Sequence, residues 1–292
     1  MDTMPSGRYR LADKDVWRVG YGAMQLAGDG VFGPPRDRGE AIAVLRAAVD
    51  AGVDHIDTAE FYGPAVVNEL IREALFPYPE SLAVVSKVAA RRDDVGAVLP
   101  YDDPDQLRAG IEENLTTLGV EQLTAVNLRV MDKAVPNQRF ADQLGALVAA
   151  RDEGLIAGIG ISNVSHRHLL TALEITDIVC VQNAYNLADR SSEAVLRECI
   201  SRGIAFVPFC PLGFPSDQRD AIRTNAVVVD VAASHGATPT QVALAWLLAI
   251  ADNILLIPGT RSRGHLAENL AAGSLTLRDD ELDRLNDAWP QG

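Results

Sequence analysis

Short apolar runs alternate with longer amphipathic segments along the whole chain. Eight of these runs are rich in Val, Ile and Leu and have the length of buried strands. They lie at residues 17–24, 53–57, 82–87, 123–129, 155–162, 178–182, 204–209 and 253–258. The segments between them repeat apolar residues at the spacing of a helix that covers a core on one side. The pattern predicts parallel strands that are each followed by a helix.

Capping residues mark the ends of several predicted helices. Pro104 and Pro239 stand in first-turn positions, which need no amide donor, while Gly119 and Gly203 stand where a helix can end in the left-handed conformation. The clearest helices are expected at residues 38–51, 104–118, 139–153, 191–202, 240–250 and 279–288. No Pro-, Gly- or Ser-rich linker separates these elements, which predicts a single domain over residues 1–292.

Eight successive strand–helix units predict a (β/α)8 TIM barrel of the α/β class, with parallel strands ringed by helices. An open doubly wound sheet is the alternative, but the first predicted strand lacks the G-x-G-x-x-G turn of a dinucleotide-binding sheet. Before the barrel, the runs RYRL and VWRV flank the turn-forming residues ADKD at 12–15. We expect them to form a β-hairpin that closes the barrel floor.

The charge balance limits the classes of partner. The chain of 292 residues carries 26 Lys and Arg against 40 Asp and Glu, which gives a net charge of −14. This acidic surplus disfavours nucleic acids and anionic membranes, because both are held mainly by Lys and Arg. We expect a small-molecule partner, no nucleic acid and no membrane. The sequence leaves the oligomeric state open, with a monomer among the options.

The chain shows no sequence signal for export. Its N-terminal segment MDTMPSGRYRLADKD has no apolar core, and the longest apolar run, at 242–251, is far shorter than the ~20 residues that cross a bilayer. Cys180, Cys199 and Cys210 cannot all pair with one another and form no Cys-x-x-Cys motif. We expect a reduced, cytoplasmic protein without a bound metal.

Ionisable residues stand at the ends of predicted strands, where barrels of this type place their chemistry. Asp57, Lys87 and Arg129 end neighbouring strands, and Tyr62 follows Asp57 in a short loop. A buried Lys87 needs a counter-ion, and Asp57 is the nearest candidate. Its cation would lower the pKa of the Tyr62 phenol and make it a usable proton donor. The alternative is that Asp57 and Lys87 form a purely structural ion pair and that Tyr62 is an ordinary loop residue. The positions of these residues in the sequence do not favour one alternative over the other.

A series of motifs in register resembles the aldo-keto reductase family from Gly20 to Asn269. They are DHIDTAEFYG at 54–63, VVSKV at 84–88, LGVEQLTAVNLRVMD at 118–132, GIGISNVS at 158–165, VQNAYNLADR at 181–190, FCPLG at 209–213, GATPTQVALAWLL at 236–248 and IPGTRSRGHLAENL at 257–270. The resemblance implies a barrel that binds NADPH and transfers a hydride to an aldehyde or ketone. It implies that Tyr62 is the general acid, that Lys87 lowers its pKa and that Asp57 holds Lys87.

The resemblance also implies a nicotinamide site. Ser162, Asn163 and Gln182 match positions that hydrogen-bond the carboxamide of the cofactor. Phe209 stands where many members carry a stacking Tyr, and stacking needs only the ring face. The backbone of residues 210–213 is expected to line the pyrophosphate, with Cys210 in place of a common Ser.

Hydroxyls and positive charge gather after the eighth predicted strand. Such a cluster at a helix N-terminus suits a 2′-phosphate, so we expect NADPH rather than NADH, although His265 stands where many members carry Arg. Glu268 and Asn269 match adenine-facing positions. The complete expected cofactor set is Gly22, Ala23, Met24, Asp57, Ser162, Asn163, Gln182, Phe209, Cys210, Pro211, Leu212, Gly213, Pro258, Gly259, Thr260, Arg261, Ser262, Arg263, His265, Glu268 and Asn269.

Arg129 departs from the family pattern, because it occupies the position of the catalytic His. A guanidinium can donate hydrogen bonds to a carbonyl oxygen but cannot act as a general base, which leaves Tyr62 as the proton donor. Asn127 shares the same strand face. The alternative is that Arg129 pairs with a carboxylate outside the pocket.

The segment around Arg129 resembles that of microbial pyridoxal reductases within the family, and an anionic, phosphate- or phenol-bearing aldehyde would suit its charge. Little chain follows the last predicted helix, so we expect an open substrate site with broad specificity. Two other functions stay open. One is a non-catalytic NADPH-binding sensor of the same fold. The other is a Schiff-base aldolase that uses Lys87, which pairing with Asp57 disfavours because the amine would stay protonated.

Overall fold

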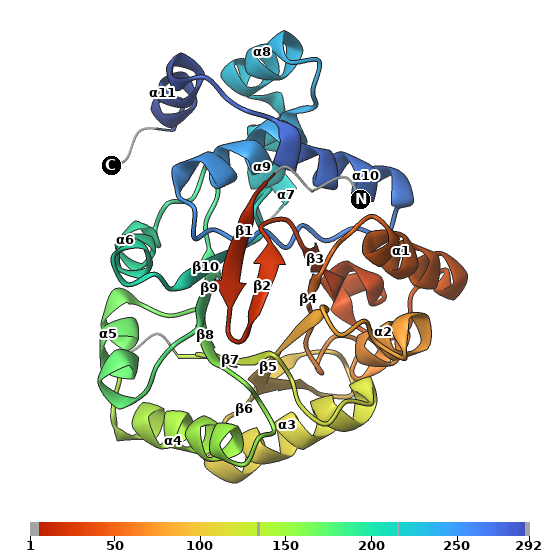
Figure 1. Ribbon diagram of the computed structural model, residues 1–292, viewed down its shortest axis with the longest axis vertical. Helices are drawn as coiled ribbons and strands as arrows, with labels where there is room; N and C mark the ends of the chain where they lie inside the picture. Colours follow the sequence, from red (N-terminus) through yellow and green to blue (C-terminus); the bar gives the residue numbers. More distant parts are fainter. Residues whose placement is uncertain (1–5, 133–134, 215, 290–292) are drawn as a thin grey trace.

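A ring of parallel strands lies at the centre of the molecule, and helices surround it (Figure 1). The computed structural model describes residues 6–132, 135–214 and 216–289, so the first five residues of the N-terminal segment considered above lie outside it. The strands follow one another in the order β3 (Tyr21–Gly22), β4 (His55–Asp57), β5 (Ala83–Arg92), β7 (Ala125–Arg129), β8 (Ile159–Ser162), β9 (Cys180–Ala184) and β10 (Ala205–Phe209).

Residues 253–257 close the ring between its first and last strands. Leu256 forms a parallel bridge with Val19, and Ile254 forms one with Phe206. The amide of Leu256 donates to the carbonyl of Arg18 at 2.8 Å. The predicted eighth strand is therefore present as a short closing segment, and the alternative of an open sheet is wrong. Within the first predicted strand, 17–24, only Tyr21 and Gly22 form a named strand of the ring, Val19 adds an isolated bridge, and Trp17 belongs to the hairpin.

The hairpin of β1 (Arg8–Leu11) and β2 (Lys14–Trp17) covers one end of the ring (Figure 1). Leu11 and Val16 are buried in the barrel interior. They pack with Ala83, Val85, Ala125, Cys180, Ala205, Val207, Leu255 and Ile257. The predicted floor hairpin is confirmed, although its turn is shorter than expected. Lys14 pairs with Leu11 in the ladder, which leaves Ala12 and Asp13 as the turn.

Eleven α-helices occur in the described residues, and they include all six of the helices that the sequence predicted most clearly. They are α1 (Arg38–Asp50), α2 (Val66–Leu75), α3 (Pro104–Leu118), α4 (Gln138–Asp152), α5 (His166–Ile175), α6 (Glu193–Arg202), α7 (Ser216–Thr224), α8 (Ala226–Ser234), α9 (Pro239–Ile250), α10 (Arg263–Ala271) and α11 (Asp279–Asp287). Pro104 and Pro239 open helices with capping boxes, and Gly119 ends α3 at a φ of 69°. Every helix in the described ranges is too short or too polar to cross a membrane.

One feature of the fold was not expected from the sequence. Strand β5 continues past Lys87 to Arg92 and pairs with antiparallel β6 (Val98–Tyr101). The continuation is VAARR at 88–92, which ends in two exposed or half-buried arginines and leads into the polar turn at 93–97. The pairing depends on the turn at 93–97, where the Asp93 carboxylate accepts hydrogen bonds from the amides of Val95 and Ala97.

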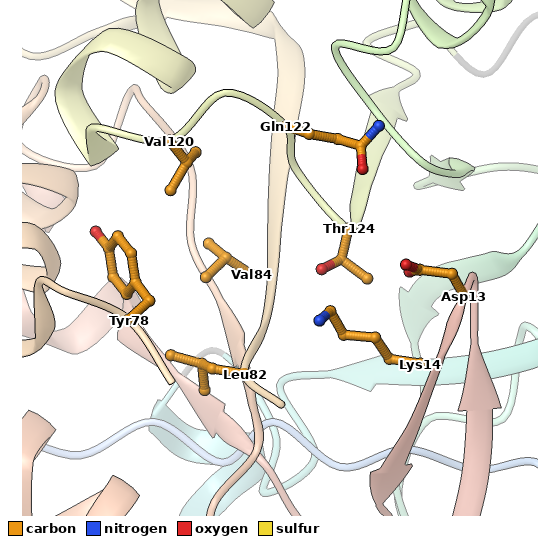
Figure 2. A pocket seen from close by; sticks show the side chains of 8 residues that line it. All are labelled: Asp13, Lys14, Tyr78, Leu82, Val84, Val120, Gln122 and Thr124. Carbon is orange, nitrogen blue, oxygen red and sulfur yellow. The ribbon is translucent and has the colours of Figure 1, made fainter. Parts of the chain in front are cut away.

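A cavity of about 160 Å³ lies at the floor, between the hairpin turn and the segments that precede β5 and β7 (Figure 2). It is lined by Asp13, Lys14, Tyr78, Leu82, Val84, Val120, Gln122 and Thr124. These residues lie at the amino ends of the strands. Because none of them belongs to the predicted site, this cavity is separate from the candidate chemistry.

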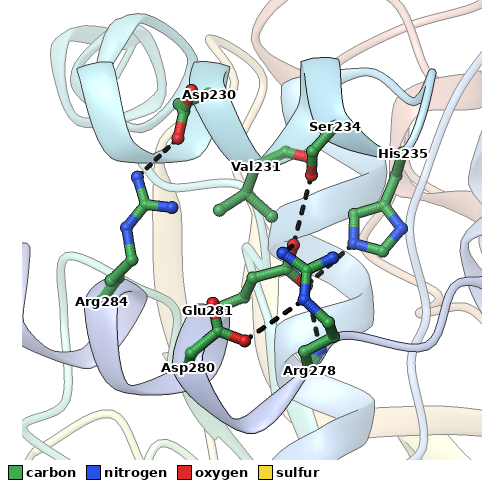
Figure 3. A network of polar contacts seen from close by, with 8 residues as sticks. All are labelled: Asp230, Val231, Ser234, His235, Arg278, Asp280, Glu281 and Arg284. Carbon is green, nitrogen blue, oxygen red and sulfur yellow. Dashed lines mark hydrogen bonds and ion pairs between the residues drawn. The ribbon is translucent and has the colours of Figure 1, made fainter.

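Helix α11 packs on α8 through a buried carboxylate (Figure 3). Glu281 is fully covered from solvent. Its oxygens lie 2.6 Å from Arg278 Nη2 and 2.8 Å from His235 Nε2, and the Ser234 hydroxyl donates to it at 3.2 Å. Burial opposes ionisation, but the hydrogen bonds outweigh it and lower the pKa of Glu281. The last helix is thus held by a charged network rather than by apolar packing alone.

Candidate active site

Polar side chains meet at the carboxyl end of the barrel because alternate residues of each strand face inward. On β5, Ala83 and Val85 belong to the barrel interior, and Lys87 follows on the same face. In the parallel register, Ser162 lies between Arg129 and Gln182. The structure therefore brings the ends of the predicted strands together, as the sequence pattern led us to expect.

Asp57 and Lys87 form a buried ion pair on adjacent strands. The Nζ atom of Lys87 lies 2.5 Å from Asp57 Oδ1, and the two side chains are 4% and 6% exposed. Lys87 also donates to the carbonyl of Thr58 at 3.0 Å, and Gln182 Nε2 donates to Asp57 Oδ2 at 2.8 Å. Burial lowers the pKa of Lys87. The negative charge of Asp57 and the interaction with Tyr62 raise this pKa by more than burial lowers it. The ion pair therefore favours the protonated form of Lys87, which argues against the Schiff-base alternative.

Tyr62 lies beside this pair, in the loop after β4. The Nζ atom of Lys87 is 5.2 Å from the centre of its ring, and Phe61 contacts the ring edge-on at a centroid distance of 5.1 Å. Burial raises the pKa of Tyr62 more than the charge and hydrogen bond of Lys87 lower it. The predicted lowering by Lys87 is present, but the net direction of the shift is opposite because of burial, which was not visible in the sequence. Tyr62 keeps its proton at neutral pH, which is the state that a proton donor needs.

A buried amide network supports the loop that carries Tyr62. The Thr58 hydroxyl donates to Asn68 Oδ1 at 2.8 Å, and Asn68 Nδ2 donates to Asn114 Oδ1 at 3.0 Å. Ser86, next to Lys87, donates to the same oxygen of Asn114. Sequence reasoning missed these residues. Their signal was the placement of asparagines on the core faces of α2 and α3, where an unpaired amide would be costly.

The residues expected at the nicotinamide offer unused hydrogen-bonding atoms. The Ser162 hydroxyl is buried at the end of β8 without a partner in the described residues. Asn163 has a φ of 61° and donates its amide to the carbonyl of Val130 at 2.7 Å. Gln182 donates to Asp57, which leaves its side-chain oxygen as an acceptor. A buried orphan hydroxyl between two amide side chains fits a carboxamide ligand.

A tight turn follows β10, where Phe209 ends the strand half-buried. Cys210 has a φ of 50°, and its carbonyl accepts from the amide of Gly213 at 2.9 Å and from Asn186 Nδ2 at 3.2 Å. Burial raises the pKa of the Cys210 thiol, against the charges of Arg219 and Arg129. The turn is therefore held by its own backbone and by Asn186, and burial favours the protonated thiol of Cys210. Pro211 is buried and Leu212 is packed against the core.

The cluster expected at the 2′-phosphate lies around the start of α10. Thr260 Oγ1 accepts from the amide of Ser262, whose own hydroxyl caps the helix. Arg261 lies 3.9 Å from Asp29, and Arg263 Nε lies 3.2 Å from Glu40 Oε1. The arginines are exposed, as expected of a surface phosphate site, but they already have acidic partners. A cavity of about 260 Å³ lies between this segment and the start of α1.

The remaining members of the expected set lie near the closing seam and on α10. A Cβ atom on Gly22 would lie 2.4 Å from the carbonyl oxygen of Ile257, so this glycine is required by the close approach of two backbone segments. Buried members are Ala23, Pro258 and Asn269, Met24 is half-buried, and exposed members are Gly259, His265 and Glu268.

Comparison with known proteins identifies the family. The profile of the aldo/keto reductase family matches residues 18–290. The chain belongs to the aldo/keto reductase family. It is 49% identical to pyridoxine 4-dehydrogenase of Escherichia coli strain K12, over 97% of this chain and 98% of that protein. It is 34% identical to an uncharacterized oxidoreductase of Schizosaccharomyces pombe, over 98% and 91% of the two chains.

Solved structures of aldo-keto reductases have the same fold. A Klebsiella pneumoniae enzyme crystallised with NADP and acetate is 25% identical, with a TM-score of 0.80 over 98% of this chain and 96% of that chain. A thermostable aldo-keto reductase bound to epalrestat is 29% identical, with a TM-score of 0.81 over 96% and 99%. The predicted family, barrel fold, NADP(H) cofactor and class of reaction, oxidoreduction of a carbonyl group, are confirmed at the level of the family.

Arg129 lies at the mouth of the barrel, at the end of β7. Its side chain is half-buried, and its Nε atom has no hydrogen-bond partner in the described residues. The alternative was that Arg129 leaves the pocket and pairs with a carboxylate. Among the residues that the structure describes, Arg129 forms no such pair. Asn127, two residues earlier, is fully buried and its Oδ1 atom contacts Cys180 Sγ at 3.5 Å. It therefore belongs to the barrel interior below the mouth.

Proposed function

We propose that this chain interconverts pyridoxal-type aldehydes and the corresponding alcohols, with Tyr62 as the proton donor for reduction. One observation carries the proposal: Tyr62, Lys87 and Asp57 form a buried cluster at the carboxyl end of the barrel. A phenol beside a fixed cation can give up its proton to a carbonyl oxygen, because the cation stabilises the phenolate that remains. Asp57 holds that cation in place.

NADPH, when bound, supplies the hydride. The carboxamide of its ring would be held by Ser162, Asn163 and Gln182, since the orphan hydroxyl of Ser162 needs a partner there. Phe209 would cover one face of the ring. Gln182 has a second task, because its bond to Asp57 couples the cofactor site to the ion pair.

The outer part of the cofactor would lie along the turn at 210–213 and the start of α10. Arg261 and Arg263 are the expected 2′-phosphate ligands. Each would exchange its present partner, Asp29 or Glu40, for the phosphate. The exchange is inexpensive because these ion pairs are exposed. The remaining residues of the expected set, from Gly22 to Met24 and from Pro258 to Asn269, complete this surface.

The relative in E. coli supports the choice of substrate, because its name describes a dehydrogenase that acts at the 4-position of pyridoxine. The alcohol at that position is oxidised to the aldehyde of pyridoxal. We extend the proposal to a single barrel domain over residues 1–292. We also propose that it acts in a reducing cytoplasm, which suits three free cysteines, and without a nucleic acid partner.

The test follows the loss of NADPH absorbance with a panel of aldehydes that includes pyridoxal. We expect Tyr62→Phe to reduce kcat by roughly 100- to 10,000-fold, because it removes the transferable proton, and to leave the Kd for NADPH unchanged. Tyr78→Phe is the matched control, because it removes a phenol at the opposite end of the barrel. Full turnover by Tyr62→Phe would contradict the assignment. Tight NADPH binding by the wild type without turnover of any aldehyde would favour the sensor.

A further inference from the structure

Arg129 brings a second positive charge to the mouth of the barrel, beside that of Lys87. Its side chain is half-buried, its Nε atom is covered without a partner, and the guanidinium forms no ion pair within residues 6–132, 135–214 and 216–289. Removing a charge from water is costly unless a partner compensates it. A bound anion would complete this arrangement.

The neighbouring acid cannot provide that compensation. Both carboxylate oxygens of Asp57 are engaged, one by Lys87 at 2.5 Å and the other by Gln182 at 2.8 Å. The charges of Lys87, Arg92 and Arg129 all act on Tyr62, whereas the Asp57 carboxylate is already committed to Lys87 and Gln182. This local positive surplus contrasts with the net charge of −14 for the whole chain.

The strand register locates Arg129: Lys87 pairs with Asn127, two residues before Arg129, and Arg129 itself pairs with Ser162. Burial raises the pKa of Tyr62, and Arg129 is among the cations that oppose this rise. Burial also raises the pKa of Cys210, which Arg219 and Arg129 both oppose. The register therefore places Arg129 at the mouth, on the strand next to Lys87, and its charge acts on both Tyr62 and Cys210. Any anion that it binds must lie close to the point where Tyr62 meets the carbonyl oxygen.

We propose that Arg129 binds an anionic oxygen next to the carbonyl group of the substrate, so that the enzyme prefers aldehydes with an ortho-phenolate. The proposal rests on the proposed function, in which the carbonyl oxygen meets Tyr62. Pyridoxal has this arrangement, because its ring hydroxyl is ortho to the aldehyde and is ionised at neutral pH. A phenolate on the opposite side of the ring would not reach the guanidinium.

The experiment compares kcat/KM for matched aldehydes at a pH where their phenols are ionised. The pairs are pyridoxal with pyridine-4-carboxaldehyde, and salicylaldehyde with 4-hydroxybenzaldehyde. We expect the wild type to prefer the ortho-hydroxy member of each pair. We expect Arg129→Gln to lower kcat/KM for that member by roughly 10- to 100-fold more than for the other member, which is the range for a charged hydrogen bond. Arg129→Lys should retain part of the preference.

Binding of NADPH alone, measured by fluorescence titration, separates a substrate role from a cofactor role. The Kd should be the same for the wild type and Arg129→Gln. Arg219→Gln is the comparison variant, because it removes another cation that acts on Cys210. We expect it to leave the ortho preference intact.

Three results would overturn the proposal while the proposed function stands: a wild type without ortho preference, an equal loss for both members of a pair, or a loss confined to NADPH binding. The first of these needs no variant, so it holds even if Arg129→Gln fails to fold. A wild type that reduces none of the four aldehydes would instead overturn the proposed function, and this proposal with it.

Discussion

His55 lies directly beneath the candidate catalytic pair and makes the stability of the barrel depend on pH. It faces the interior two residues before Asp57 on β4 and is 2% exposed. A Cβ atom on Gly20 would lie 2.3 Å from its ring, so the imidazole is pressed against that backbone. Neither ring nitrogen has a hydrogen-bond partner of good geometry in the described residues. Burial lowers the pKa of His55 from 6.5 to about 4, which nearby backbone groups of Trp17 and Leu256 only partly offset.

The direction of the pH effect follows from proton binding. The unfolded chain takes up a proton near the ordinary pKa of 6.5, whereas the folded protein takes it up only near 4. The stabilising contribution is therefore complete above about pH 6.5 and is lost as the pH falls toward 4. The difference in pKa corresponds to about 3 kcal/mol in total, of which about 2 kcal/mol is lost between about pH 8 and pH 5.

Urea unfolding at several pH values tests this reasoning with His55→Phe, which keeps a ring but cannot titrate. We expect the free energy of unfolding of the variant to be flatter with pH by about 2 kcal/mol between about pH 8 and pH 5, whatever its absolute stability. His55→Leu gives a second readout if the larger ring does not fit. His265→Gln, at an exposed histidine, should keep the wild-type slope. Parallel pH curves for the wild type and His55→Phe would refute the argument.

Two further predictions concern Lys87 and Glu281. Lys87→Met removes the charge and hydrogen bond that lower the pKa of Tyr62, so less phenolate forms at a given pH. We therefore expect the pH profile of alcohol oxidation to move to higher pH. An unshifted profile would count against this role of Lys87. Glu281→Gln removes the carboxylate that Arg278 and His235 share. The C-terminal helix should then be cleaved faster in limited proteolysis at neutral pH, with little change in kcat; equal cleavage rates would show that apolar contacts hold α11.

Much of the fold could be predicted from the sequence because its signals are local. Apolar runs of strand length, Pro104 and Pro239 at first-turn positions, and glycine at a helix end act within a few residues of themselves. The inward alternation along a strand is equally local, and it placed Lys87 at the mouth of the barrel. The extension of β5 to Arg92 was missed, because its strand conformation comes from pairing with β6 rather than from its own residues.

The sequence by itself determined the order of strands and helices, the side chains available at each strand end and, through its motifs, the family. The tertiary structure alone decided how those side chains meet. Gln182 holds Asp57 from 125 residues away, burial keeps the pKa of Tyr62 high, and Arg129 is left without a partner among the described residues. The physical reason is that pairing and desolvation depend on which distant segments enclose a group, and a local pattern carries no record of them.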